Sequence, residues 1–285
     1  MTVYIYPNLK KQFSLECTKQ VIQKLSEMGC NVIASEALDV GELGKCLEIM
    51  DQNDAVAVCD VIITIGGDGT ILRIASLAAK YRKKLLGINC GRLGFMASLE
   101  KDELDDLSKL LTSEYKTESR MMLDVVIEHP DSTFATVTAL NDIVITHGFN
   151  YYINDFTVLA DGTTVSSLRA DGLIFSTPTG ASAYSLSAGG PLIEPTMDCI
   201  EFTQICPHSL FARTMLFAPN KLIEVKYRAD GTIGVSADGA SPIPVTKSDR
   251  IYIRKSSLRL DLIDIRGDNF FKSIGAKLMQ PAKEI

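Results

Sequence analysis

The sequence predicts two domains of different class, an α/β domain over residues 1–120 followed by a β-rich, sandwich-like domain over residues 121–265. The first prediction rests on the alternation of short β-branched runs with helical patterns, which is typical of strand-helix-strand units around a mostly parallel sheet. The second rests on closely spaced β runs separated by Asp-Gly turns. Residues 266–285 carry apolar side chains at helical spacing, and we expect this segment to pack back on the first domain.

Hydrophobic periodicity locates the elements of the first domain in order. Residues 15–28 place apolar side chains one helical turn apart, and Gly29 follows as a natural C-cap. The β-branched run 61–65 leads into Gly66 and Gly67 and then into a helical pattern, the order that an anion-binding loop requires. The predicted strands cover residues 3–6, 31–34, 61–65 and 84–89, the predicted helices cover residues 15–28, 71–81 and 104–111, and residues 35–60 are less regular.

In the second domain, two Asp-Gly pairs each separate two β runs. Asp161-Gly162 lies between FTVLA and TTVSS, and Asp230-Gly231 lies between EVKYR and TIGVS. Both pairs predict tight hairpins, because glycine tolerates positive φ. Further strands are predicted at residues 123–128, 143–146, 173–176, 250–254 and 258–265, with at most one or two helices.

Composition limits the classes of function. Of 285 residues 46% are hydrophobic and 22% charged, and the net charge is −6, so a packed core is expected and a nucleic-acid partner is not. Seven cysteines without a Cys-x-x-Cys pair argue against a zinc or redox centre and predict free thiols in a reducing cytoplasm. The N-terminus does not resemble a signal peptide, and no apolar run is long enough to span a membrane.

The stretch GGDGT at residues 66–70 is the most informative local motif. Glycines between a strand and a helix let backbone amides approach a phosphate, which the helix N-terminus also attracts. Asp68 would repel that phosphate unless it holds a metal or accepts the proton of an attacking hydroxyl. The alternative is that Asp68 only caps a helix beginning at Gly69. The motif matches neither a P-loop nor the dinucleotide fingerprint.

A second stretch, DGLIFSTPTGASAYSLSAGGP at residues 171–191, runs from a predicted strand into small residues. Small side chains allow a heterocycle or ribose to lie against the backbone, hydroxyls supply hydrogen bonds, and Tyr184 offers a stacking face. A capped helix with a tightly packed small face is an equal alternative.

A third polar group, Asn141-Asp142, stands at the mouth of the predicted strand 143–146. Taken alone, such a pair is more often a turn or a cap than a binding site. It gains weight only together with the other two stretches.

Four blocks in this order make the chain resemble the NAD kinase family: GGDGT at 66–70, LND at 140–142, the stretch 171–191, and ICPHSL at 205–210. The blocks span most of the chain, and the long one is highly specific. GGDGT alone is also similar to loops of diacylglycerol kinases, sphingosine kinases and phosphofructokinases. The resemblance implies an α/β nucleotide-binding domain and a β-rich domain with NAD bound between them.

The resemblance assigns chemistry to the first motif. It implies that Asp68 is the general base for the adenosine 2′-hydroxyl of NAD, which is phosphorylated to give NADP. Gly69 and Arg73 correspond to neighbours of the dinucleotide, and Gly67 and Phe95 are expected among its contacts.

In the second domain the resemblance places NAD contacts at several positions, and the chain departs from the family's usual residues at some of them. The family's Asn-Glu pair, which binds the adenosine side of NAD, corresponds to Asn141 and Asp142. Because aspartate is shorter than glutamate by roughly 1.5 Å, this ribose contact is direct, water-bridged or weakened. Asp171 corresponds to the acidic residue at the nicotinamide portion, and Arg169 is a candidate phosphate or NAD contact. Further expected contacts are Ser182, Ala183, Tyr184, Ser185 and Ser187, whereas His208 is expected to be structural.

The implied substrates are NAD and ATP or polyphosphate, with a divalent ion such as Mg²⁺ or Mn²⁺ holding the donor phosphates beside the glycine turn. No protein ligand of the metal is predicted. The resemblance also implies a homodimer or homotetramer. Two alternatives remain from the residues: a lipid or sugar kinase that shares the glycine loop, and a non-catalytic dinucleotide sensor.

Overall fold

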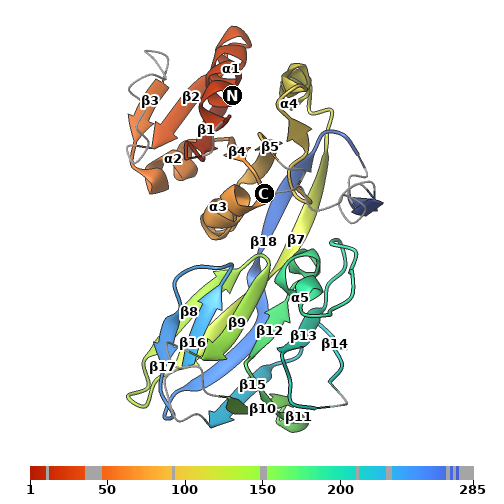
Figure 1. Ribbon diagram of the computed structural model, residues 1–285. Coiled ribbons are helices and arrows are strands. Elements are labelled where there is room, and N and C mark those ends of the chain that lie inside the picture. The colour runs from red at the N-terminus through yellow and green to blue at the C-terminus, as the bar shows by residue number, and fades with distance from the viewer. Residues whose placement is uncertain are drawn as a thin grey trace. The chain divides into compact units, whose positions relative to one another are not determined.

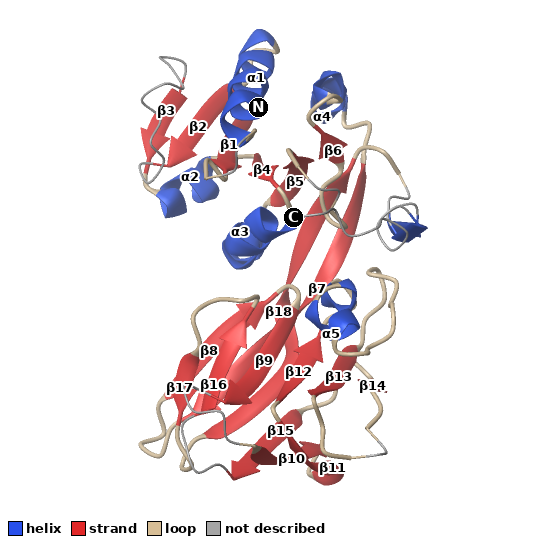
Figure 2. Ribbon diagram, in the orientation of Figure 1, coloured by secondary structure: helices blue, strands red, loops and turns tan. Residues whose placement is uncertain are grey.

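The computed structural model describes residues 1–10, 13–35, 47–91, 94–147, 153–209, 212–228, 233–267, 270–271 and 274–275. The chain divides into two compact units. The first unit comprises Met1–Ser119 and Leu260–Ile285, and the second comprises Arg120–Arg259. Helices gather in the first unit and strands dominate the second (Figures 1 and 2), which confirms the predicted fold class.

The first unit contains a parallel sheet whose strands follow the order β3-β2-β1-β4-β5. All six residues of β4 are buried, because a strand in the middle of a parallel sheet is covered on both faces. Ile63 pairs with Ile5 on one side and Leu86 on the other, and all three belong to the core of this unit. The strands are β1 (Thr2–Pro7), β2 (Asn31–Ser35), β3 (Leu47–Met50), β4 (Val61–Gly66), β5 (Lys84–Asn89) and the short β6 (Leu99–Glu100).

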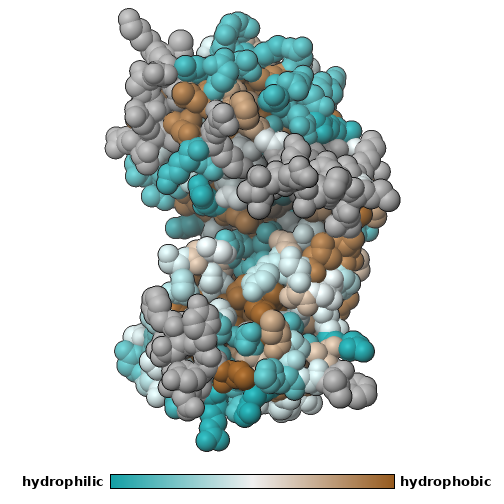
Figure 3. Space-filling model, in the orientation of Figure 1, coloured by the Kyte–Doolittle hydropathy of each residue, from teal (hydrophilic) through white to brown (hydrophobic). Residues whose placement is uncertain are grey.

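Among the described residues, three α-helices longer than one turn accompany this sheet: α1 (Ser14–Glu27), α2 (Gln52–Val58) and α3 (Asp68–Lys80). The outer face of the region around α1 is mainly hydrophilic (Figure 3), as expected of an amphipathic helix with one buried stripe. Part of the less regular segment 35–60 forms β3 and α2. The start of α2 carries a recognisable signal, since the Asp51 carboxylate accepts a hydrogen bond from the Asn53 amide at 2.7 Å.

Two predicted elements differ from the structure. Residues 104–111 were expected to form one helix, but the chain makes a 3₁₀ segment, η1 (Leu104–Ser108), before the single turn α4 (Lys109–Thr112). The two strands expected at 250–254 and 258–265 are one strand, β18 (Arg250–Asp264). The residues left between the two predicted strands include Ser256, which is buried, and β18 continues through it.

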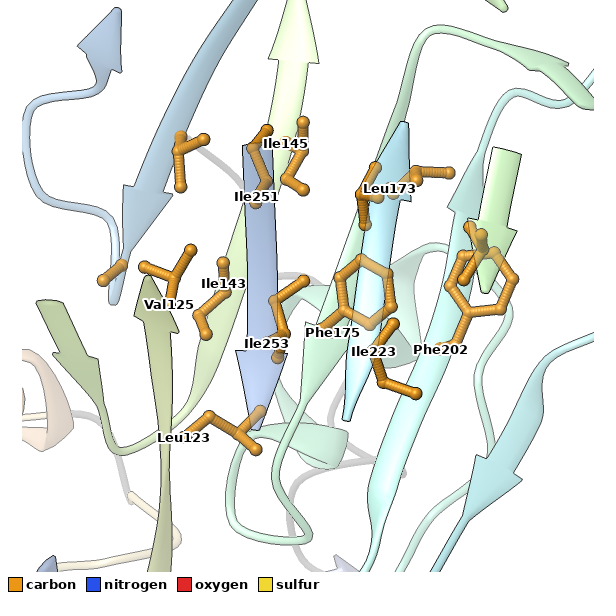
Figure 4. Packing of buried hydrophobic residues seen from close by; sticks show 14 of the residues in the cluster. Leu123, Val125, Ile143, Ile145, Leu173, Phe175, Phe202, Ile223, Ile251 and Ile253 are labelled. Atoms are coloured by element: carbon orange, nitrogen blue, oxygen red, sulfur yellow. The ribbon is translucent and has the colours of Figure 1, made fainter. Parts of the chain in front are cut away.

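The second unit is built from antiparallel strands around one core. One sheet has the order β14-β13-β12-β9-β16-β17, and strands facing it follow the order β11-β10-β15-β18, with β7 pairing with β18 and β8. Apolar side chains from both sets meet between them (Figure 4). Phe175 and Phe202 stack there with ring centroids 5.2 Å apart. This arrangement is the expected sandwich.

Most elements of this unit are short strands. They are β7 (Lys116–Glu128), β8 (Phe134–Ala139), β9 (Asp142–His147), β10 (Asn154–Ala160), β11 (Thr163–Ala170), β12 (Gly172–Ser176), η2 (Gly180–Ser182), α5 (Tyr184–Ser187), β13 (Ile200–Ile205), β14 (Met215–Phe217), β15 (Ile223–Arg228), β16 (Ile233–Ala237) and β17 (Ile243–Val245). The Asp161-Gly162 hairpin is present, with φ of 48° and 79° at its two residues. The predicted Asp230-Gly231 hairpin lies outside the described residues.

The C-terminal segment belongs to the first unit. Leu262 of β18 pairs with Leu85 of β5, and the ring of Phe270 lies 6.2 Å from that of Phe95. Phe270, Phe271 and Ile274 are in helical conformation, whereas Leu278 lies outside the described residues.

Candidate active site

The glycine turn joins β4 to α3. Gly66 has φ of +158°, and a Cβ added there would lie 2.4 Å from Thr70 Oγ1, so the turn requires glycine. A Cβ added at Gly69 meets no atom within 4 Å, so the space beside the first turn of α3 is open. An open helix N-terminus of this kind favours an anion.

Asp68 is the first residue of α3, and its side chain is held by the chain segment that follows β5. The Phe95 amide donates to Asp68 Oδ2 at 2.8 Å, and the Met96 amide donates to Oδ1 at 3.3 Å. The N-cap position of α3 is Gly67, with no side-chain cap hydrogen bond. The two hydrogen bonds of the Asp68 carboxylate go to amides outside α3, so this side chain is held by a segment beyond its own helix.

Gly94 allows the segment after β5 to lie close to the Asp68 carboxylate. A Cβ added at Gly94 would lie 2.0 Å from Asp68 Oδ1 and 2.7 Å from its Cγ, far inside normal contact distance. Of the other residues predicted in this unit, Arg73 is exposed on α3, and Phe95 is half-buried against Phe270.

In the second unit, Asn141 and Asp142 lie at the start of β9 and are held by Asp238. The Asp238 carboxylate accepts hydrogen bonds from the amides of Leu140, Asn141 and Asp142 at 2.7, 2.7 and 3.1 Å. The Asn141 Oδ1 atom is buried without a partner among the described residues. The Asn141 side chain thus has unused hydrogen-bonding capacity, which a ligand could satisfy.

The Asp142 carboxyl lies in an unfavourable environment for its charged form. Burial, followed by the nearby charges of Asp238 and Glu201, raises its pKa from 3.8 to about 7. Asp142 is 6% exposed. At neutral pH this carboxyl therefore exists in both protonation states.

The stretch of small residues packs against the backbone of the Asn141 pair. Thr177 Oγ1 donates to the Leu140 carbonyl at 2.6 Å and accepts from the Gly180 amide at 3.1 Å. A Cβ at Gly180 would lie 2.2 Å from the Asn141 carbonyl oxygen, so this contact also requires glycine. The two polar groups noted separately in the sequence, 141–142 and 171–191, are thereby brought together within one unit.

The predicted contacts on this stretch differ in accessibility. Tyr184 is 45% exposed, Ser182 and Ala183 are half-buried, and Ser187 is exposed. Ser185 is fully buried, and its hydroxyl donates to Glu201 Oε1 at 2.8 Å. The structure therefore places Ser185 beneath the stretch, where it anchors α5.

The remaining predicted residues lie around the end of β11. Arg169 is exposed and forms an ion pair with Asp155, with Nε donating to Oδ1 at 2.8 Å. Its carbonyl accepts from the His208 amide at 2.8 Å. Asp171 is half-buried, and its amide donates to the Ile205 carbonyl. His208 itself is exposed, and the structural role expected of its imidazole stays a prediction.

Sequence reasoning missed three residues of these sites: Gly94, Glu201 and Asp238. Asp238 precedes Gly239 and looks like part of an ordinary turn. Glu201 could have been noticed in the sequence because it is a carboxylate between two apolar residues, Ile200 and Phe202, which both face the core. The alternation of a strand turns Glu201 to the other face of its sheet.

Comparison with protein families decides between the kinases that share a glycine loop. The ATP-NAD kinase N-terminal domain matches residues 3–115, and the ATP-NAD kinase C-terminal domain matches residues 140–265. The chain belongs to the ATP-NAD kinase family. It is therefore an enzyme of NAD phosphorylation, and a lipid or sugar kinase is not favoured.

Relatives of this kinase match nearly its whole length. The NAD kinase of Symbiobacterium thermophilum is 36% identical over 273 residues, covering 95% of this chain and 96% of the relative. That of Thermoanaerobacter sp. is 36% identical, covering 98% and 99%. Yeast NADH kinase in complex with NADH superposes with a TM-score of 0.88 at 25% identity, covering 100% and 90%. Archaeoglobus fulgidus NAD kinase, at 24% identity and a TM-score of 0.75, supports the fold.

Two further observations concern metal binding and membrane-spanning helices. Within the described residues, no group of three or more His, Cys, Asp or Glu side chains could hold a metal ion. No helix among the described residues has the length and apolar character to cross a bilayer.

Proposed function

We propose that this kinase transfers the terminal phosphoryl group of ATP or polyphosphate to the adenosine 2′-hydroxyl of NAD, with Asp68 as the general base. The observation that carries this assignment is the fixed carboxylate of Asp68 at the glycine turn, held by the amides of Phe95 and Met96. A carboxylate whose orientation is set before the substrate arrives loses little entropy when it meets the hydroxyl.

The proposed reaction needs few reacting side chains. The 2′-oxygen attacks the terminal phosphorus, its proton passes to the Asp68 carboxylate, and the bond from that phosphorus to the bridging oxygen breaks. Open space beside Gly69 at the start of α3 suits the donor phosphates. Alignment and charge neutralisation supply most of the acceleration in such transfers.

A divalent ion fits this arrangement through the donor. Mg²⁺ commonly keeps several waters and binds substrate phosphates together with one or two carboxylates. Bound there, Mg²⁺ or Mn²⁺ would neutralise the charge that develops on the donor phosphates. Asp68 is the carboxylate of the glycine turn that could contribute to such a site.

The second unit holds the acceptor. Asn141 and Asp142 bind the adenosine side, Asn141 through its buried Oδ1, which lacks a partner among the described residues. The exposed ring of Tyr184 stacks on the dinucleotide. Asp171 contacts the nicotinamide portion, with Arg169, Ser182, Ala183 and Ser187 nearby. We further propose that the protein forms a homodimer or homotetramer. We also propose a cytoplasmic location, in keeping with the free thiols of the described cysteines.

The test is to incubate the purified protein with NAD, Mg²⁺ and either ATP or polyphosphate, and to measure NADP formation. The wild-type chain is expected to form NADP, and failure with every donor would remove the proposed reaction. Asp68→Asn is expected to lose most of the turnover while still binding NAD. Asp54→Asn is a matched control, because Asp54 is an exposed residue in the first turn of another helix, α2. Near-normal turnover by Asp68→Asn would refute the base assignment.

A further inference from the structure

A row of polar residues crosses the outer face of the sheet that carries Asp142. Asp142 of β9 lies opposite Ser176 of β12, and Ser176 lies opposite Glu201 of β13. Ser176 and Glu201 are fully buried. Residues opposite one another on neighbouring strands lie about 5 Å apart, so the side chains of Glu201 and Asp142 start about 10 Å apart on the same face.

Glu201 is hydrogen-bonded to the turn that carries the exposed tyrosine. Its Oε1 accepts from Ser185 Oγ of α5 at 2.8 Å and from Thr203 Oγ1 at 3.3 Å. A Cβ added at Gly190 would lie 2.3 Å from the same oxygen. Tyr184 begins α5, directly before Ser185. The position of Tyr184 therefore depends on an anchor that ends at a buried carboxylate.

Packing does not require a carboxylate at this position. Glu201 Oε2 is buried without a hydrogen-bond partner among the described residues, which makes the charged form costly. Burial raises the pKa of Glu201 to about 7 against the opposing hydrogen bonds of Ser185 and Thr203. An apolar residue would avoid this cost, so the carboxylate calls for another explanation.

We propose that Glu201 is a positioning residue for NAD phosphorylation, which fixes the Tyr184 turn through Ser185 and sets the charge of Asp142 through its own charge. This inference rests on the proposed roles of Asp142 and Tyr184 in NAD binding. It assigns two effects to one side chain, and they separate experimentally because one needs the hydrogen bond and the other needs the charge.

Two charged groups among the described residues raise the pKa of Asp142. They are Asp238, at the end of the neighbouring β16, and Glu201 itself. Cys199 precedes Glu201 on the same segment, and Arg120 reaches the Thr179 hydroxyl from β7. Two charges about 10 Å apart in a medium of effective dielectric about 20 interact strongly enough to move a titration by about one pH unit.

The experiment is to measure kcat and the KM for NAD between pH 5.5 and 8.5 for the wild type and three variants. In the wild type we expect this KM to fall as pH rises through about 7, because an ionised Asp142 accepts ribose hydroxyl hydrogen bonds better. Glu201→Gln removes a charge that is present only while Glu201 is ionised, and the pKa of Glu201 is itself about 7. The fall should therefore occur at lower pH in this variant, by less than about one pH unit, with the largest difference in KM around pH 7. The value of kcat should change less than KM.

The second variant, Ser185→Ala, keeps the charge and removes the anchor. It is expected to raise the KM for NAD at every pH without moving the transition. Glu194→Gln is the control, because Glu194 is an exposed carboxylate of the same unit, and it should leave both constants unchanged. A purely structural Glu201 would instead raise the KM of Glu201→Gln at every pH, and that result would overturn the proposal, as would an unmoved transition.

Asp142→Asn separates the two levels of the argument. If this variant abolishes the pH transition but Glu201→Gln does not shift it, the role of Glu201 is wrong and that of Asp142 stands. If Asp142→Asn leaves the transition in place, the proposed NAD contact at Asp142 fails. Should Glu201→Gln not fold, Glu201→Leu provides the same test, because leucine is uncharged and suits a buried strand position.

Discussion

Adding a single methyl group at Gly94 should displace the proposed catalytic carboxylate without touching it chemically. In Gly94→Ala the new Cβ would start 2.0 Å from Asp68 Oδ1, whereas ordinary contacts begin near 3.4 Å. The carboxylate must then move by roughly 1.4 Å or the loop must shift, and the bonds from the Phe95 and Met96 amides lengthen. Because a misplacement of about 1 Å can cost about 100-fold in rate, we expect kcat to fall by about that factor, or about 2.7 kcal/mol.

The assay is NADP formation at saturating NAD and ATP, with NAD affinity measured separately and thermal unfolding as a check on folding. Gly91→Ala is the matched control, since a Cβ at Gly91 of the same loop meets no atom within 4 Å. We expect the control to keep normal turnover. If Gly94→Ala folds and retains more than about a third of wild-type kcat, the orientation of Asp68 is not what limits the reaction.

Three further predictions concern the second unit. Because burial raises the pKa of Asp142 from 3.8 and of Glu201 from 4.5 to about 7, the folded state binds more protons than the unfolded state between these values. The unfolding free energy should therefore fall as pH rises from about 4 to about 7 and level off at higher pH. Urea unfolding at pH 5, 6, 7 and 8 would measure this change. A rise in unfolding free energy over this interval would contradict the buried environments of the two carboxyls. Asp238→Ala leaves three amides without their acceptor and should cost about 3 kcal/mol or more of stability and weaken NAD binding, whereas a loss below about 1 kcal/mol would show that water replaces the carboxylate. Phe175→Ala opens a cavity beside Phe202 and should cost about 3–5 kcal/mol by denaturant unfolding; a much smaller loss would mean that the sandwich collapses into the space.

Local patterns were sufficient for most of the fold because they report on burial directly. The run 61–65 is apolar at nearly every position, and β4 is buried on both faces; residues 15–28 repeat at helical spacing, and α1 buries one stripe. The turn at Asp161-Gly162 follows from the backbone angles that glycine tolerates. Where the pattern was weak, as at Ser256-Ser257 within β18, local reasoning introduced a break, because pairing with neighbouring strands decides whether such a stretch continues.

The sequence by itself identified the glycine turn, the family and the residues to examine, because each of these is written in short contiguous blocks. Tertiary structure decided which partners hold them. Gly94 lies against Asp68 across 26 residues of chain, and Glu201 meets Ser185 only because β13 passes beneath α5. Asp238, nearly a hundred residues from Asn141, supports that backbone through its carboxylate. These contacts join positions far apart in the chain, and no local pattern of apolar and polar residues encodes which of them will meet.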